Sequence, residues 1–206
     1  HSIVCRPELG ERAFYLKRQT NHLTRSLLHP FGEPTFAREF RNIQRYSRLG
    51  IPALQAAFFA ARKLPGESLA ILLTRALDGW TELERLLTGW SNLAADRQHS
   101  IILACAALAS RLHGAGQMHG CFYPKHIFLR EGSNGFEACL IDLEKTRPLR
   151  FGKRDRVKDL EPLLRRISVW NKIEVEQFLR AYLGGDAGLA EWMRCIQERG
   201  MDKRRR

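Results

Sequence analysis

The sequence lacks any apolar run long enough to cross a membrane, and it does not begin with a secretory signal pattern. A membrane-spanning helix needs about 18 or more apolar residues in succession, and a signal peptide joins a charged start to an apolar core. The five cysteines are scattered and odd in number, and none forms a CxxC pair. A disulfide framework is therefore not expected, and a reducing compartment fits the chain better.

The sequence also lacks a run of aromatic residues interleaved with basic ones, which stacking on single-stranded nucleic acid would need. Positive charge dominates instead, because 34 lysines and arginines against 22 aspartates and glutamates give a net charge of +12. This excess favours an anionic partner, whether nucleic acid, nucleotide, phosphosugar or acidic lipid surface. The densest basic run, MDKRRR at the end, is expected to be a solvated tail.

The first third of the chain is predicted to contain strands and one helix. The 206 residues, 44% of them hydrophobic, suffice for one compact domain or two small lobes. A helix is expected over 33–52, because Phe36, Phe40 and Ile43 follow an i, i+4, i+7 pattern. Thr35 is the expected cap of this helix. The expected strands are 3–6, 13–18, 54–62 and 68–74.

The remainder of the chain is predicted to be mostly helical. Its strongest helix, at 96–116, carries one apolar stripe and ends in glycines. The stripe consists of Ile101, Ile102, Cys105, Leu108, Ala109 and Leu112. Further helices are expected at 81–87, 155–169, 172–183 and 189–198, and strands at 127–130 and 137–141. The sequence therefore predicts an α+β protein with a strand-rich part, 1–76, and a mostly helical part, 77–206.

The order of these elements matches the one that phosphoryl transfer uses in the protein-kinase-like fold. That fold uses a strand lysine on the nucleotide phosphates and a helix glutamate that holds the lysine. A catalytic loop, H-R-D-L-x-x-x-N, and a metal-binding aspartate follow. Lys17 lies in a predicted strand, and Glu39 lies at the edge of the apolar stripe of the first predicted helix. Each alone is typical of a solvated surface residue, but their order favours a kinase-like site.

The stretch MHGCFYPKHI, after the long helix, fits the catalytic-loop template with unusual side chains. His119 takes the place of the histidine, Cys121 that of the catalytic aspartate, and His126 that of the metal-binding asparagine. Cys121 and His126 are five positions apart, as the template requires. The run LIDLEK then offers Asp142 where the metal-binding aspartate belongs, followed by Leu and Glu rather than Phe and Gly.

These motifs carry a resemblance to a known family. HGxxYxKHI followed by LIDLEK resembles the Kdo/WaaP lipopolysaccharide kinase family, in particular its InaA-like branch. YLKRQ, FxREFxNI and RDRVKDLEPLL are similar to the family as well, so the resemblance covers nearly the whole chain. It implies a small two-lobed protein-kinase-like fold. It also implies phosphorylation, with ATP and Mg²⁺, of a heptose or Kdo hydroxyl in the lipopolysaccharide inner core.

The resemblance further implies a location, partners and residue roles. The protein would be cytoplasmic and peripheral at the inner membrane of a Gram-negative cell, with a core sugar as acceptor and no nucleic acid beyond the nucleotide. The residues carried over by position are Lys17 and Glu39 as the phosphate-anchoring pair, Thr74 and Ala76 beside Lys17 at the nucleotide, His119 and Cys121 in the catalytic loop, Asp159 as the brace of that loop, and His126 and Asp142 at the metal.

The chain departs from the kinase pattern in two places. Cys121 replaces the catalytic carboxylate, and losing a positioned base costs typically ~10²–10⁴ in rate. No Gly-rich phosphate loop is visible either; in this fold the loop would precede the strand at Ser2 to Arg6, outside this chain. The alternative function is therefore a pseudokinase of the same fold, which binds nucleotide or a partner without efficient phosphoryl transfer.

Three interpretations come from other classes of protein. Cys121 with His119 and His126 could form a thiol hydrolase site, although nothing else in the sequence supports a triad. The same three residues with His113 could bind Zn²⁺, although their spacing fits no familiar zinc pattern. The positive charge could instead serve a protein that binds nucleic acid through its helices.

Overall fold

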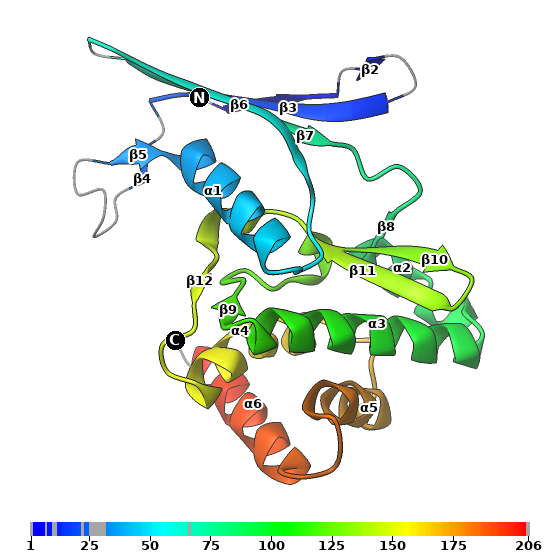
Figure 1. Cartoon of the computed structure of the whole chain (residues 1–206). Coiled ribbons are helices and arrows are strands. Elements are labelled where there is room, and N and C mark those ends of the chain that lie inside the picture. The colour runs from blue at the N-terminus through cyan, green and yellow to red at the C-terminus, as the bar shows by residue number, and fades with distance from the viewer. Residues whose placement is uncertain are drawn as a thin grey trace. The chain divides into compact units, whose positions relative to one another are not determined.

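The computed structural model describes residues 2–6, 8–9, 12–21, 23–24, 32–65 and 67–204. The chain forms two compact units (Figure 1). Unit 1 comprises His1–Asp78 together with Asp142–Glu144, and unit 2 comprises Gly79–Ile141 and Lys145–Arg206. In the first part of the chain the division falls after Asp78, two residues beyond the boundary at residue 76 that the sequence predicts. A three-residue segment from the later chain also belongs to unit 1.

Unit 1 is built on an antiparallel sheet with the strand order β1-β3-β7-β6, and β2 pairs with β3. The strands are β1 (Ser2–Cys5), β2 (Glu8–Leu9), β3 (Arg12–Thr20), β6 (Ala56–Leu64) and β7 (Glu67–Arg75). A separate pair consists of β4 (Leu23–Thr24) and β5 (Glu33–Pro34). The four strands predicted for this part of the chain are confirmed, with small shifts at their ends.

Helix α1 (Thr35–Arg48) covers one face of this sheet and packs on β6 and β7 (Figure 1). Phe36 and Ile43 are buried, as the apolar stripe predicts. Phe40 stacks on Phe59 of β6, with ring centroids 4.8 Å apart. The helix is therefore attached to the sheet by its predicted apolar face.

The predicted cap of α1 is wrong. Pro34 stands immediately before the helix, and no side chain there accepts a capping hydrogen bond. Thr35 is already the first helical residue, and its hydroxyl lies 2.9 Å from the hydroxyl of Thr24. The helix therefore starts one residue earlier than a cap at Thr35 would require, because a cap residue stands just before the first helical residue.

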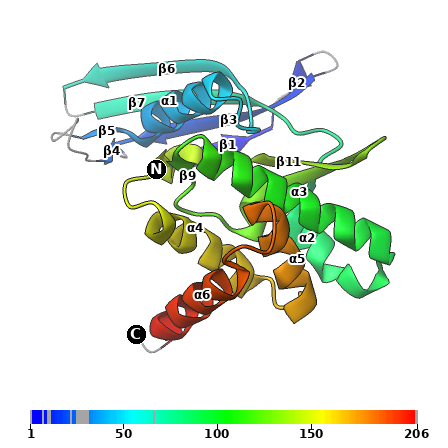
Figure 2. The same cartoon turned by 60° about the horizontal axis from the view of Figure 1, so that its bottom comes forward.

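Unit 2 is mostly helical. In this unit α3 packs on α5 and on β11, and α4 packs on α6 (Figure 2). The α-helices of the unit are α2 (Leu83–Thr88), α3 (Ala95–Gly114), α4 (Lys153–Arg166), α5 (Lys172–Leu183) and α6 (Leu189–Arg204). Its strands are β8 (Thr81–Glu82), β9 (Gln117–Met118), β10 (Ile127–Gly132), β11 (Gly135–Leu140) and β12 (Arg147–Pro148). Short 3-10 helices are η1 (Trp90–Asn92), η2 (Pro124–His126) and η3 (Leu143–Lys145), the last of which ends in unit 2.

Helix α3 provides the core of unit 2. All six residues of its predicted stripe are buried, so the stripe is confirmed. Cys105 lies in this stripe without exposed surface, and burial raises the pKa of its thiol to about 12. Such a thiol stays protonated and acts as a small apolar core residue.

The ends of the last helices follow local signals. Asn171 and Glu174 form a reciprocal capping box at the start of α5, and Gly184 ends the helix in the left-handed conformation. The basic run at the end, expected to be a solvated tail, continues α6 as far as Arg204, and its residues 201–203 are exposed. Residues 205 and 206 lie outside the described residues. Lys203 in this run lies 3.4 Å from the buried carboxylate of Glu161.

In the described ranges no helix has both the length and the apolar character needed to span a membrane.

Candidate active site

Lys17 and Glu39 form an ion pair inside unit 1. The Nζ of Lys17, on β3, lies 2.7 Å from the Oε1 of Glu39, on α1. Glu39 is 1% exposed, and burial raises the pKa of its carboxyl while the Lys17 ammonium opposes this rise. A buried carboxylate beside a partly exposed ammonium restricts where that ammonium can point.

Gln19 is a supporting residue that the sequence analysis missed. It lies two positions after Lys17 on β3, so both side chains point to the same side of the sheet. Its Oε1 accepts a hydrogen bond from the backbone N–H of Phe36 at 3.2 Å, at the start of α1. The strand that carries Lys17 therefore also holds the helix that carries Glu39. The two-residue alternation of side chains along a strand could have placed Gln19 on the same face as Lys17.

Asp142 belongs to unit 1 and has a left-handed backbone, with φ of 58°. The predicted strand at 137–141 ends at Leu140, and Asp142 stands after it, directly before the 3-10 helix η3. Asn42 of α1 donates a hydrogen bond from Nδ2 to the carbonyl of Leu143 at 2.7 Å. Asn42 follows Glu39 by three positions, so one face of α1 provides both the partner of Lys17 and the anchor of the turn at Asp142.

The segment Asp142–Glu144 brings negative charge to the ion pair. The carboxylates of Asp142 and Glu144 both act to raise the pKa of Glu39, which places them in its electrostatic neighbourhood. Carboxylate oxygens are donors that Mg²⁺ prefers, and Mg²⁺ is usually held by one or two of them with waters and substrate phosphates. Within the ranges that the structure describes, no three His, Cys, Asp or Glu side chains converge to hold a metal ion alone. The chemistry of Asp142 therefore fits a magnesium ion that phosphates help to hold.

Thr74 and Ala76 stand at the end of β7 and just after it. Thr74 is 2% exposed and is paired with Tyr15 of β3. The backbone N–H of Ala76 donates to the carbonyl of Ala13 at 2.9 Å. This N–H is occupied within the unit, so a nucleotide base would have to meet other atoms of the segment.

Asp159 holds the predicted catalytic loop in unit 2. Its two carboxylate oxygens accept hydrogen bonds from the backbone N–H groups of His119 and Gly120, each at 2.7 Å. The Nε2 of His113 lies 3.2 Å from the same carboxylate, and its Nδ1 lies 2.8 Å from the Tyr182 hydroxyl. Asp159 is 1% exposed, so these bonds compensate a carboxylate that is almost completely removed from water.

Gly120 is required by the same loop geometry. Its φ of 79° lies in the left-handed region, and an added Cβ would come within 2.7 Å of the carbonyl oxygen of Lys145. A larger residue would therefore displace the backbone on one side or the other. The glycine lets the loop turn just before Cys121.

Both loop histidines form hydrogen bonds with backbone atoms. The backbone N–H of Cys121 donates to Nδ1 of His119, so the proton of a neutral His119 ring is on Nε2, which donates to the carbonyl of Ile141 at 2.9 Å. His126 donates from Nδ1 to the carbonyl of Cys121 at 2.8 Å, and its own carbonyl accepts from the N–H of Ile141. The two rings thus order the loop around the buried Cys121 and hold Ile141, the residue before Asp142.

The hydrogen bonds of the histidines bear on the alternative that they bind Zn²⁺ and on the predicted role of His126 at the metal. Both nitrogens of His113 and both of His119 have partners inside unit 2, which leaves neither ring open to a zinc ion. An imidazole nitrogen, the donor that His126 would supply to a metal, suits transition metals better than Mg²⁺. Its predicted role at the metal therefore stays a prediction that its chemistry does not favour.

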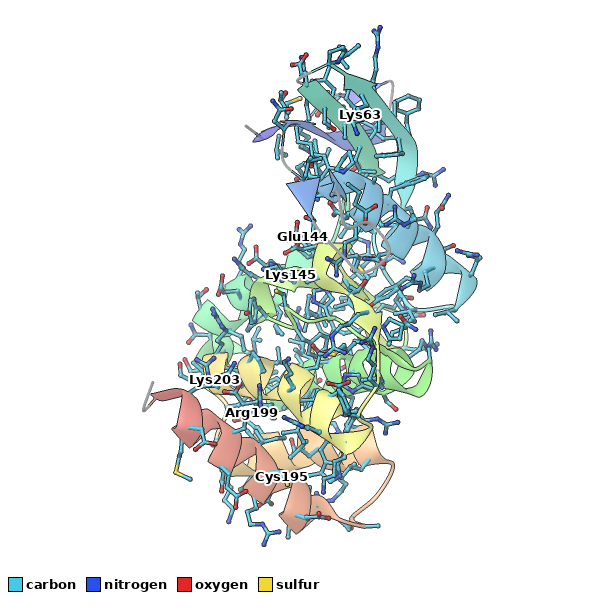
Figure 3. The ribbon with its side chains drawn as sticks, turned by 90° about the vertical axis from the view of Figure 1, so that its left-hand side faces the viewer. Lys63, Glu144, Lys145, Cys195, Arg199 and Lys203 are labelled. Atoms are coloured by element: carbon cyan, nitrogen blue, oxygen red, sulfur yellow. The ribbon has the colours of Figure 1, made fainter. Side chains whose placement is uncertain are left out.

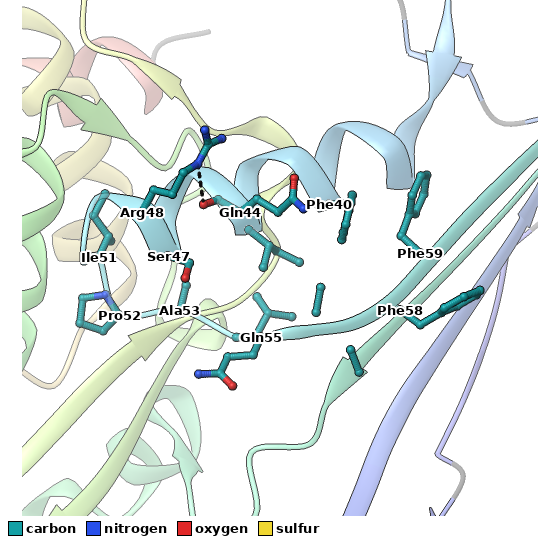
Figure 4. Close-up of a pocket in the computed structure, with 14 residues that line it drawn as sticks. Phe40, Gln44, Ser47, Arg48, Ile51, Pro52, Ala53, Gln55, Phe58 and Phe59 are labelled. Carbon is teal, nitrogen blue, oxygen red and sulfur yellow. Dashed lines mark hydrogen bonds between the residues drawn. The ribbon is translucent and has the colours of Figure 1, made fainter.

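A groove in unit 1 lies away from the ion pair. It has a volume of about 1120 Å³ and lies between α1 and the start of β6 (Figure 4). Its walls include Phe40, Ile43 and Phe59, and neither Lys17 nor Glu39 lines it. The groove is therefore not the place where the ion pair would meet a phosphate.

The family of the chain follows from a comparison with known sequences. The model of the lipopolysaccharide kinase (Kdo/WaaP) family matches residues 2–182. The chain belongs to this family. It is 32% identical over 151 residues to the protein InaA of Escherichia coli strain K12, which covers 70% of this chain and 67% of InaA. This Kdo/WaaP family member is therefore a lipopolysaccharide kinase-like protein.

A solved structure shows the same fold. WaaP in complex with acyl carrier protein aligns with a TM-score of 0.72 and 22% identity, over 98% of this chain and 84% of WaaP. The predicted protein-kinase-like α+β fold is thereby confirmed. Membership in a kinase family supports phosphotransferase activity and nucleotide use in general terms.

The brace of the loop in this Kdo/WaaP family member can be tested by stability. Asp159→Ala is expected to lower the free energy of unfolding by about 3–5 kcal/mol, because two backbone donors and His113 lose a buried acceptor. Urea unfolding measures the change. The control is Asp186→Ala, which removes an exposed carboxylate paired with Arg180 and should cost at most about 1 kcal/mol. Equal losses in the two variants would contradict the bracing role.

Proposed function

We propose that this protein is an ATP- and Mg²⁺-dependent kinase that phosphorylates a heptose or Kdo hydroxyl of the lipopolysaccharide inner core. The observation that carries the proposal is the ion pair of Lys17 and Glu39, at 2.7 Å, beside the carboxylate of Asp142 in a member of a lipopolysaccharide kinase family. Phosphoryl transfer needs little covalent chemistry from the protein and depends on positioning and on neutralising charge. These groups suit both tasks.

Lys17 would bind the phosphate oxygens of the nucleotide. The side chain of Lys17 is 22% exposed, whereas the side chain of Glu39, which holds it, is 2% exposed. The buried partner would keep the ammonium oriented, and a lysine ammonium has two further donors that could bind phosphate oxygens. Gln19 and Asn42 would act as positioning residues, because they hold the start of α1 and the turn that contains Asp142.

Asp142 would hold the magnesium ion, with Glu144 as a second nearby carboxylate. A bound Mg²⁺ supplies positive charge that neutralises phosphate oxygens during transfer. The left-handed backbone at Asp142 puts this carboxylate on a turn that Asn42 and the buried Leu143 keep in place. A rigid carrier is what a metal-binding carboxylate requires.

The catalytic loop would position the acceptor hydroxyl. Asp159 fixes the backbone at His119 and Gly120, and the rings of His119 and His126 fix both sides of Cys121. The thiol of Cys121 replaces the carboxylate that orients and deprotonates the hydroxyl in related sites. The expected activity is therefore slow. The presence of Cys121 at this position also favours the second candidate function, a pseudokinase that binds nucleotide without efficient phosphoryl transfer.

The acceptor determines where such a protein would act. A kinase of the lipopolysaccharide core would work in the cytoplasm, peripherally at the inner membrane, and would bind no nucleic acid beyond its nucleotide. The positive net charge of +12 supports association with an anionic surface of this kind.

Transfer of labelled phosphate tests the proposal. The purified protein is incubated with Mg²⁺, ATP labelled at the γ-phosphate and dephosphorylated core oligosaccharide, and the product is located by mass spectrometry. Label on a core sugar, absent for Lys17→Met, is the expected result. Protection against thermal unfolding by Mg²⁺-ATP without any label on the sugar would favour the pseudokinase. Failure of both readouts would contradict nucleotide use by this chain.

A further inference from the structure

A basic cleft in unit 2 is not used by the proposed reaction. It has a volume of about 440 Å³ and lies where the segment before α4, the first turns of α4 and the last part of α6 meet. Four cationic side chains line it, together with one aromatic and one acidic side chain: Arg147, Arg154, Lys158 and Arg199, with Phe151 and Asp155. Arg154 and Lys158 are four positions apart on α4, so they share one face of the helix.

The single acid of this cleft is already neutralised. Asp155 accepts hydrogen bonds from the guanidinium of Arg147 at 3.1 and 3.3 Å and from the backbone N–H groups of Arg150 and Phe151 at 2.8 and 3.2 Å. The Arg147 bonds come first among the causes that hold the pKa of Asp155 far below its usual range. Asp155 therefore cannot serve as the counter-charge of the other cations.

Arg154, Lys158 and Arg199 have no carboxylate partner in the part of the chain that the structure describes. The Nε of Arg199 is buried there without a hydrogen-bond acceptor. Cations that line one cleft repel one another, and an anion bound there would relieve this cost. The cleft thus has the charge and the donors of an anion site, and the planar guanidinium groups of its arginines match a phosphate.

A second cleft continues the first along α6. It shares Arg154 and Arg199 with the first and adds Lys153 and Lys203, with Glu198 and Asp202 as acids. Cys195, Arg199 and Lys203 follow one another at four-residue spacing along α6 (Figure 3). All three line the second cleft. Lys153 and Lys203 are paired with Glu191 and Glu161. All three cations without a carboxylate partner therefore line the first cleft, and two of them line the second cleft as well.

Phe151 bears on which kind of phosphate compound the cleft would bind. Its side chain is 64% exposed at the edge of the cleft, and the guanidinium of Arg154 lies 5.9 Å from its ring centroid. An exposed aromatic ring beside unpaired cations is typical of proteins that lie on an anionic bilayer, where the ring enters the interface and the cations bind headgroup phosphates. A soluble phosphate compound would not require the exposed ring.

We propose that Phe151, Arg154, Lys158 and Arg199 form a docking site for phosphate headgroups of an anionic lipid surface. The site deepens the proposed function, since it would hold the enzyme at the surface that carries its acceptor. It does not depend on nucleotide, on Lys17 or on phosphoryl transfer. Docking and catalysis can therefore fail independently.

Vesicle binding without nucleotide tests the docking site. Flotation compares vesicles of phosphatidylcholine alone with vesicles that also contain phosphatidylglycerol. The variant Arg154→Gln/Lys158→Gln/Arg199→Gln is expected to partition onto the anionic vesicles on the order of 100-fold more weakly, since each cation near such a surface contributes about 1 kcal/mol. Phe151→Ser should weaken partition by roughly 10-fold. Thermal unfolding checks that these variants are folded.

A matched control separates a site from diffuse charge. Arg85→Gln/Arg111→Gln/Lys172→Gln removes the same charge from exposed positions on α2, α3 and α5 of the same unit. Equal losses in the two triple variants would overturn the site. Displacement from vesicles by inorganic phosphate at matched ionic strength would reassign it to free phosphate, and tighter binding of duplex DNA than of vesicles would reassign it to nucleic acid. Lys17→Met should lose phosphate transfer and keep vesicle binding.

Discussion

Asp142→Asn is expected to lower phosphate transfer to the core sugar by about 10²–10³-fold, because it removes the charge that would hold magnesium against the phosphates. Protection of the protein by Mg²⁺-ATP against thermal unfolding should fall as well. The backbone makes asparagine the appropriate replacement. Asp142 has φ of 58°, a conformation that aspartate and asparagine tolerate and that most other residues do not. The variant therefore changes charge while the turn persists.

The matched control for this variant is Glu144→Gln. Glu144 lies on the same turn in unit 1, and its carboxylate also acts to raise the pKa of Glu39. The variant Glu144→Gln removes the same charge from the neighbourhood of the ion pair. It therefore measures the effect on transfer of losing one negative charge there, without loss of the proposed metal-binding side chain. We expect Glu144→Gln to retain most of the transfer and of the nucleotide protection. Two variants with the same activity, or an Asp142→Asn protein that binds Mg²⁺-ATP as the parent does, would refute the assignment of the metal to Asp142.

Elements with strong local signals were predictable from the sequence. The apolar stripe of α3, the four strands of unit 1 and the bounds of α5 all follow from periodicity and caps that neighbouring residues provide. Lys17 and Glu39 were found in the same way. Lys17 lies in a strand and Glu39 in a helix that local periodicity predicts, and the order of the two residues along the chain matches the protein-kinase-like fold.

Contacts between distant segments were not predictable in this way. Nothing near Asn42 in the sequence indicates that its side chain binds the carbonyl of Leu143, 101 positions later. The tail after residue 200 has the composition of a solvated segment, yet Lys203 pairs with the buried Glu161 and α6 continues. In each case a tertiary interaction overrides the local preference.

Cys121→Asp is expected to raise transfer to the core sugar by about 10²–10⁴-fold, the range that a positioned general base contributes. The surrounding loop is already ordered for such a group. The backbone N–H of Cys121 donates to His119, its carbonyl accepts from His126, and Asp159 holds the two residues before it. The substitution therefore changes the side chain at a position whose backbone has its bonds satisfied.

Two further variants make this experiment decisive. Cys121 is only 7% exposed, so a carboxylate there costs stability, and thermal unfolding has to accompany every rate. Cys121→Asn has nearly the shape of the aspartate variant without its basicity and should stay at the rate of the parent protein. Cys121→Asp/Asp142→Asn should lose the gain, because the base would act on a phosphate that is no longer neutralised. A gain confined to Cys121→Asp establishes a slow kinase that lacks its base. If the aspartate variant is folded and protected by Mg²⁺-ATP but transfers no more phosphate than the asparagine variant, the chain is a pseudokinase, because restoring the base then restores nothing.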